Sequence, residues 1–262
     1  MTLWKHELKM NFKTLLIWSM SVGIICFACL LLFTGLEESM EGMAEMYGQM
    51  GAFSTALGLD KVSIDTIEGF YATEVALMFA LGGAMFAAMT GAALLSKEEE
   101  AHTSEFLNTL PLGRMHIVYT KYISLISLIF LFQIICIIWI LAGFCGAGEF
   151  PPMKEFLLYH VAQFLMQLEI ATICFVISAW NNKRQMGLAL GLALLLYMMD
   201  LMCRVLPDIE NLKYVTPYYF SNAADIFTNK SLDGVMLGIC LAVIAFGAVA
   251  AGAIYRKRDL AA

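Results

Sequence analysis

The stretch IVYTKYISLISLIFLFQIICIIWILA, residues 117–142, is almost wholly apolar and carries one charged side chain, Lys121, near its start. The hydrocarbon core of a bilayer is about 30 Å thick, so a helix that crosses it needs roughly 20 mostly apolar residues. The stretch meets that length. It does not alternate apolar and polar residues, as the strands of a membrane barrel do, so it predicts a helix that spans a membrane.

Similar apolar runs lie on both sides of this stretch. We expect membrane-spanning helices at residues 15–36, 72–95, 117–142, 156–180, 187–206 and 234–255. The composition agrees, because 60% of the 262 residues are hydrophobic and 15% are charged, against about 45–50% and about 25% in soluble domains. The sequence therefore predicts an all-α integral membrane protein with six spans, in which residues 1–262 form a single transmembrane domain.

The residues before the first span show a helical repeat of their own. Trp4, Leu8 and Phe12 recur at every fourth position, with Lys5, Lys9 and Lys13 beside them. An amphipathic helix of this kind lies in the membrane interface with its basic side against anionic headgroups. We therefore expect an interfacial helix over residues 3–13; alternatively, the lysines only hold this end in the cytoplasm. The lack of a suitable cleavage site favours an uncleaved anchor.

Lysine and arginine are divided unequally between the two sides of the membrane. Six spans place alternate loops on opposite sides, and the side that holds both ends of the chain has eleven of these residues against five. Cytoplasmic segments carry the excess, so we expect both termini and residues 97–114 in the cytoplasm. The acidic segment 37–71 is then external. With a net charge of -6, the chain gives no indication of nucleic-acid binding.

The segment between the second and third spans is polar but carries an apolar stripe. It reads SKEEEAHTSEFLNTLPLGR, residues 96–114. Ser96 and Glu99 have the spacing of a capping box, and Pro111 ends a helix at the residue before it, so we expect a helix over 97–110. Its apolar face consists of Thr103, Phe106, Leu107 and Leu110. That face must dock either on the protein's own spans or on a separate soluble subunit.

This segment resembles the cytosolic loop of ABC-2 type permeases. In that loop an acidic cluster is followed by Gly-Thr, a Glu, two apolar residues, a Pro, Ser-Arg and then a Lys that opens the third span. The matching residues are Glu98, Glu99, Glu100, Thr103, Glu105, Phe106, Leu107, Pro111, Arg114 and Lys121. His102 replaces the usual Gly, and Gly113 replaces the usual Ser. Further similar motifs are Glu7-Leu-Lys, the stretch from Asn11 to Trp18, Glu68-Gly-Phe-Tyr-Ala-Thr-Glu74 and Tyr255-x-x-Arg-Asp-Leu260. The resemblance therefore covers the whole chain.

The resemblance implies the permease subunit of an ATP-driven exporter in the plasma membrane of a bacterium. In that family two permeases, identical or related, pair with two cytosolic ATPase subunits. The helix over 97–110 would be the coupling helix, which contacts the ATPase through Glu98, Glu99, Glu100, Thr103, Glu105, Phe106, Leu107, Leu110, Pro111 and Arg114. The chain itself would be no enzyme and bind no cofactor. ATP and Mg would bind the ATPase, since no GxxxxGK[ST] motif occurs here.

Outward transport by such apolar spans suits a hydrophobic or amphipathic cargo such as a peptide, an antibiotic or a lipid. Ionisable groups within spans are candidates for a substrate path. Glu169 falls near the middle of the fourth span, with Gln163 and Gln167 on nearby turns, and Glu74 falls at the outer edge of the second span. The alternative for Glu169 is a protonated carboxyl that hydrogen-bonds a neighbouring helix.

The fifth span carries two patterns that favour packing. Asp200 and Arg204 are four residues apart, on one helix face, where we expect an intramembrane ion pair. Gly187 and Gly191 form a small-xxx-small pattern, which permits close helix approach within the chain or between two chains.

The external segment carries methionines at helical spacing: Met40, Met43, Met46 and Met50. Thioethers bind Cu(I), so copper handling is one alternative function, whereas packing of an external amphipathic helix is the simpler interpretation. A structural or assembly membrane protein without transport is a further alternative. An intramembrane enzyme is disfavoured, because the sequence has no GxSxG and no HExxH motif.

Overall fold

The computed structural model describes residues 2–48, 50–103 and 113–257. Within these ranges helices are the regular elements and no strand occurs, and six helical stretches are long and apolar enough to cross a membrane. The predictions of an all-α protein and of six spans are confirmed.

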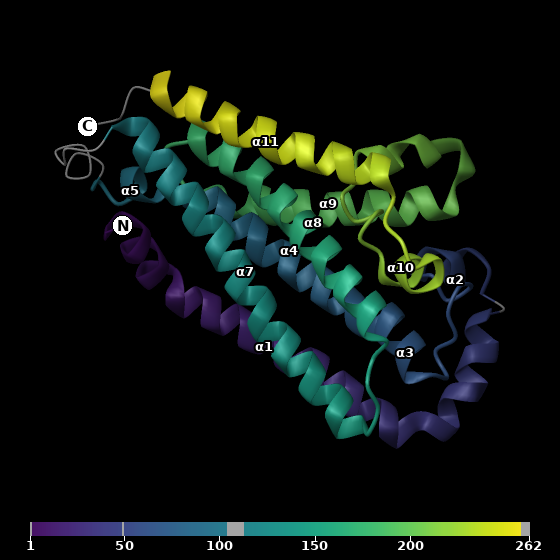
Figure 1. Cartoon of the computed structure of the whole chain (residues 1–262). Coiled ribbons are helices and arrows are strands. Elements are labelled where there is room, and N and C mark those ends of the chain that lie inside the picture. Colours follow the sequence, from purple (N-terminus) through teal and green to yellow (C-terminus); the bar gives the residue numbers. More distant parts are fainter. Residues whose placement is uncertain (1, 49, 104–112, 258–262) are drawn as a thin grey trace.

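The helices follow one another as Figure 1 shows. The long ones are α1 Thr2–Gly48, α4 Ala76–Ala93, α7 Arg114–Ala147, α8 Met153–Trp180, α9 Met186–Val205 and α11 Gly234–Lys257. The short ones are α2 Ala52–Leu57, α3 Ile67–Phe70, the π turn Tyr71–Val75, α5 Lys97–Glu100, the 3-10 helix Pro207–Tyr214 and α10 Ala223–Asn229. The start of α1, the end of α11 and α5 lie at one end of the bundle, which we call the terminal end. The helices α2, α3 and α10 lie at the opposite end (Figure 1).

Helix α1 is continuous over 47 residues, or about 70 Å at 1.5 Å per residue. Residues 3–13, expected as a separate interfacial helix, are its first turns. No glycine or proline occurs between Leu3 and Val22, so nothing in the backbone interrupts the helix. At the other end α1 continues past residue 36 into the segment that carries the methionines.

Helices α4 and α8 form the centre of the bundle. About two thirds of each span is buried, 67% in both, against 22% for α11. Helix α4 packs against α8 and α9, α1 runs along α7, and α11 covers α8 and α7. The close approach of α4 to α8 requires small residues, because a Cβ on Gly91 would meet the backbone carbonyl of Ala171.

The π turn before α4 is held by aromatic side chains. Tyr71 is fully buried, and its hydroxyl lies 3.1 Å from Nε2 of His160. Its ring contacts those of Phe144, Phe156, Tyr159 and Phe227, with centroids 5.2 to 6.0 Å apart. The Glu68 to Glu74 motif therefore fixes the start of this span to α7, α8 and α10.

Candidate functional site

The segment expected to couple to an ATPase is described as far as Thr103 and again from Gly113. Glu105, Phe106, Leu107, Leu110 and Pro111 lie outside the described residues. The expectation of one continuous helix over 97–110 needs correction, because α5 ends at Glu100 and His102 has a φ of 54°.

The end of α5 shows which position His102 takes in place of the family's glycine. The His102 N–H donates to the Glu99 carbonyl at 3.0 Å, and the Thr103 N–H donates to the Glu98 carbonyl at 2.8 Å. These two bonds form a Schellman motif, in which the first residue past the helix is left-handed and usually glycine. His102 occupies that position, where the family has its glycine.

The start of α7 shows which position Gly113 takes in place of the family's serine. Gly113 is the N-cap of α7 and offers no side-chain hydrogen bond, whereas serine, the usual residue of the family, is a preferred N-cap. The capping box expected at Ser96 is not formed either. Its hydroxyl donates to the Ala92 carbonyl at 3.1 Å, while the backbone N–H groups of Leu95 and Ser96 donate to Ser178 Oγ on α8.

Four charged side chains at the terminal end form what we call the first-loop cluster: Glu7, Lys97, Glu98 and Lys121. Glu7 on α1 pairs with Lys97 and, at 3.2 Å, with Lys121. Lys121 on α7 also pairs with Glu98 and donates to the Leu94 carbonyl at 2.6 Å. The side chains of Glu7 and Lys121 are 1% and 0% exposed, so the start of the segment is anchored to two spans by buried charges.

A second pair extends this anchoring to the segment between α8 and α9. Arg184 Nε lies 2.8 Å from Glu100 Oε2. The hydrogen bonds from Arg184 hold the pKa of Glu100 below its usual range. The other predicted coupling residues that the structure describes also have fixed places. Glu99 is buried, and Thr103 Oγ1 donates to the Glu98 carbonyl at 3.3 Å. Arg114 donates to the Arg256 carbonyl at 3.3 Å.

Sequence reasoning did not single out Glu7, Lys97 or Arg184 as site residues. Glu7 is an acid within an otherwise basic lead, and that exception was the available signal. Its lysine partners lie far along the chain, Lys97 being 90 residues away, so spacing alone could not pair them.

The candidate path residues do not share one cavity. Gln163 Nε2 donates to the Ser221 carbonyl at 2.8 Å, whereas Gln167 is buried against Gly83 of α4. Glu169 lines a small cavity with Phe220, Met236 and Cys240 among others. Glu74 is half-buried on the π turn.

Asp200 and Arg204 belong to a group of four at the opposite end, the far-end cluster, with Lys61 and Asp225. Arg204 Nε lies 3.0 Å from Asp200 Oδ2 and Nη1 lies 2.7 Å from Asp225 Oδ2, while Nη2 donates to the Tyr219 carbonyl at 3.2 Å. Lys61 pairs with Asp225 at 2.6 Å. Burial alone would raise the pKa of Asp225, but Arg204 and Lys61 outweigh it and hold that pKa below its usual range.

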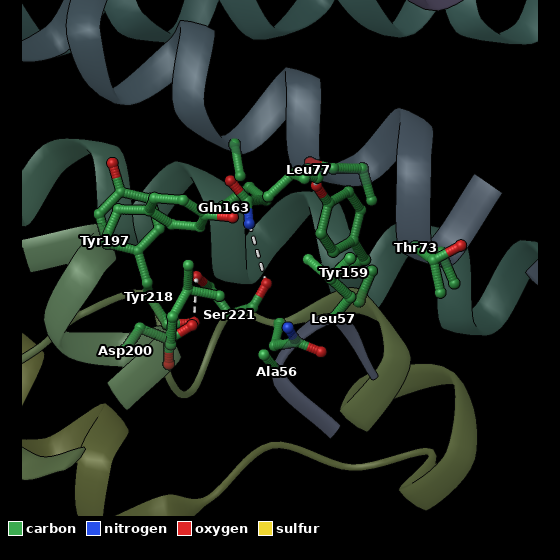
Figure 2. Close-up of a pocket in the computed structure, with 16 residues that line it drawn as sticks. Ala56, Leu57, Thr73, Leu77, Tyr159, Gln163, Tyr197, Asp200, Tyr218 and Ser221 are labelled. Atoms are coloured by element: carbon green, nitrogen blue, oxygen red, sulfur yellow. Dashed lines mark hydrogen bonds between the residues drawn. The ribbon is translucent and has the colours of Figure 1, made fainter. Parts of the chain in front are cut away.

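A cavity of about 40 Å³ lies beside this cluster (Figure 2). It is bounded by α2, the π turn and α4, by α8 and α9, and by residues 218–223. Gln163, Tyr197, Asp200, Tyr218 and Ser221 supply polar atoms to its wall.

The remaining predicted residues lie elsewhere. Met43 packs against the core, Met46 and Met50 are 53% and 49% exposed, and the side chain of Met40 is outside the described part of the structure. A Cβ on Gly187 or Gly191 would meet no atom of the described chain within 4 Å, so this pattern faces away from the bundle.

Comparison with known proteins gives one result for the whole length. No curated protein matches the chain. The family model described as ABC-2 family transporter protein matches residues 1–260, which is essentially the whole chain and includes all six spans. The chain therefore belongs to the ABC-2 family of transporter proteins.

Proposed function

We propose that this membrane subunit is the permease half of an ATP-driven exporter and works with two cytosolic ATPase subunits. ATP and Mg would bind the ATPases, and this chain would supply the path. The absence of a phosphate-binding GxxxxGK[ST] motif from the sequence supports a separate ATPase chain.

The first-loop cluster is the observation that carries this proposal. Lys121 and Glu7 are buried, and each has two charged partners, so the start of the 97–113 segment is fixed to α1 and α7. A packed network of this kind moves as a unit. A force applied to the segment by an ATPase would therefore displace both spans, which is what coupling requires.

The charge distribution supports the direction of transport. The loops and ends that the sequence assigns to the side of the termini carry eleven of the sixteen Lys and Arg residues. This favours a cytoplasmic location for the terminal end in the plasma membrane of a bacterium. The far-end cluster and the cavity beside it would then face outward. A hydrophobic or amphipathic cargo fits spans of this apolarity.

A second permease, identical or related, would complete the transporter. Gly187 and Gly191 on α9 face away from the bundle and support a helix-to-helix contact with the second permease, because small residues let two helices approach closely in a membrane.

The test begins with a detergent pull-down of the tagged chain, mass spectrometry of the eluate and an ATPase assay. We expect a stoichiometric P-loop ATPase whose activity the permease stimulates. Leu107→Asp should abolish that stimulation without lowering the unfolding midpoint, since it places a charge on the predicted docking face, whereas Leu107→Met should retain it. Full stimulation in Leu107→Asp would remove the coupling assignment, and no ATPase in several mild detergents would favour a membrane protein without transport.

Glu169 remains our candidate for the path itself. Its Oε2 atom is buried and has no hydrogen-bond partner in the described chain, which leaves it available to a passing group. Glu169→Gln should change export or its pH dependence in proteoliposomes. Wild-type transport at every pH would assign the residue to helix packing.

A further inference from the structure

The cavity beside the far-end cluster is lined by polar atoms that the protein itself leaves unused. Within the part of the chain that the structure describes, Asp200 Oδ1, Gln163 Oε1 and the Tyr218 hydroxyl are buried without a hydrogen-bond partner. The three residues are 3%, 1% and 4% exposed, and all three line the cavity (Figure 2). Buried polar groups in proteins are normally paired, so three unpaired ones around one space indicate a ligand.

Three hydroxyl donors of the wall are already bonded to backbone carbonyls. The Thr73 hydroxyl donates to the Gly69 carbonyl, the Tyr159 hydroxyl to Ala76 and the Ser221 hydroxyl to Pro217, at 2.9, 2.8 and 3.2 Å. The amide nitrogen of Gln163 donates to the Ser221 carbonyl. The unused Asp200 and Gln163 atoms are acceptors, and a hydroxyl accepts as well as donates. The wall therefore offers acceptors to a hydrogen-bond donor, and the acidic Asp200 side chain disfavours an anion.

Charge and aromatic rings favour a cationic donor. Among the described residues that line the cavity, Asp200 is the charged one, and the rings of Tyr159, Tyr197 and Tyr218 line the same space. Tyrosine rings attract cations. Arg204 and Lys61 lie close by, but Arg204 binds the other oxygen of Asp200, and both cations bind Asp225. Two acids balance two bases in this cluster, and Asp200, which lines the cavity, keeps one buried oxygen without a partner.

We propose that the cavity is a binding site for a primary ammonium group, held by Asp200 Oδ1, Gln163 Oε1 and the Tyr218 hydroxyl. A volume of about 40 Å³ on this measure admits roughly two or three water-sized groups, enough for an ammonium head and the first carbon of its chain. The site lies at the end opposite the first-loop cluster. On the proposed function, it would hold the amine of an amphipathic cargo near the exit.

Methylammonium is the probe, and tetramethylammonium is its matched control, because it carries the same charge without an N–H donor. Thermal unfolding of the purified full chain in lipid nanodiscs is measured at pH 7 and constant ionic strength. The midpoint should rise and saturate with methylammonium and stay constant with tetramethylammonium. Equal responses to the two cations, or no response, would overturn the site and leave the cavity as a water-filled space.

Tyr218→Phe provides the second test. The hydroxyl has no partner in the protein, so its loss should leave the unliganded midpoint unchanged or higher, while methylammonium binding weakens about tenfold. Tyr214→Phe, on an exposed residue outside this wall, should bind as the wild type does. Unweakened binding in Tyr218→Phe would overturn the site even if Asp200→Asn fails to fold.

The outcome is separable from the exporter proposal. If methylammonium does not bind while an ATPase copurifies and is stimulated, the ammonium site is wrong and the exporter stands. If methylammonium binds but no ATPase is found, the site stands and the exporter proposal falls.

Discussion

The two ends of the bundle each carry two acids and two bases, but the two groups are built differently. In the first-loop cluster Lys121 is fully enclosed and bonds Glu7, Glu98 and a backbone carbonyl, so its three donors are used. In the far-end cluster the Arg204 side chain is 3% exposed and bonds three acceptors, yet Asp200 keeps one buried oxygen free beside a cavity. The difference indicates that the first-loop cluster holds spans together and that the far-end cluster borders a binding site. We call the first-loop cluster the clamp and the residues that line the cavity the binding wall.

The clusters also differ in what they join. The first-loop cluster connects two long spans, α1 and α7, through α5. The far-end cluster connects one span, α9, to α10 and to Lys61 in the segment after α2. Charges that join spans resist their relative movement, whereas charges that join the segments between spans fix those segments over the end of the bundle.

Removing one partner from the clamp should have the largest effect. Lys121→Met would leave the Leu94 carbonyl without its donor and Glu7 with one lysine, and breaking a buried ion pair in this way costs about 3–5 kcal/mol. The unfolding midpoint in detergent measures the loss. Lys61→Met is the control from the far-end cluster, where a side chain that is 38% exposed should cost below about 1 kcal/mol. Equal losses would contradict the distinction between the two ends.

Arg204→Lys sharpens the comparison at the opposite end. Lysine keeps the charge but cannot reach Asp200, Asp225 and the Tyr219 carbonyl at once from a planar fork, so we expect a loss of about 2 kcal/mol, measured by SDS titration in mixed micelles. Stability equal to that of the wild type would show that the far-end cluster needs only a positive charge.

A smaller, stabilising effect is expected next to the clamp. His102→Gly removes a side chain from a left-handed position, which should gain about 1 kcal/mol and slow amide exchange at Thr103. Ala101→Gly is the matched control, because Ala101 has a φ of -86° and gains nothing from glycine. Faster exchange in His102→Gly would show that the histidine makes a contact of its own.

Acid should loosen the far-end cluster, with the smallest effect of the series. Because Arg204 and Lys61 make the pKa of Asp225 lower in the folded than in the unfolded chain, its ionised form stabilises the fold above the unfolded pKa. That contribution is lost as the pH falls through the folded pKa. Unfolding midpoints measured downward from pH 5 should fall less in Asp225→Asn than in the wild type. Parallel curves would mean that the pairs with Arg204 and Lys61 add nothing to stability.

The spans could be predicted because about twenty consecutive apolar residues leave a chain little choice other than a membrane helix. The binding wall could not. Tyr218 lies in a short stretch between two spans that shows no periodicity. Gln163 is 58 residues before Ser221, to whose carbonyl it donates, so spacing could not bring them together. Likewise, the replacement of glycine by His102 was visible in the sequence, but its meaning depended on a backbone angle that only the fold supplies.

The π turn at Tyr71–Val75 has a consequence for how chains of this kind vary in length. An α-helix advances about 100° per residue, and a π turn holds one residue more than an α turn. Deleting one residue here would rotate Tyr71 away from His160, while everything after Val75 would stay in place. The turn therefore acts as a spacer inserted into an ordinary helix. A homologue without the extra residue would have to attach the segment before Tyr71 at a different angle around α4.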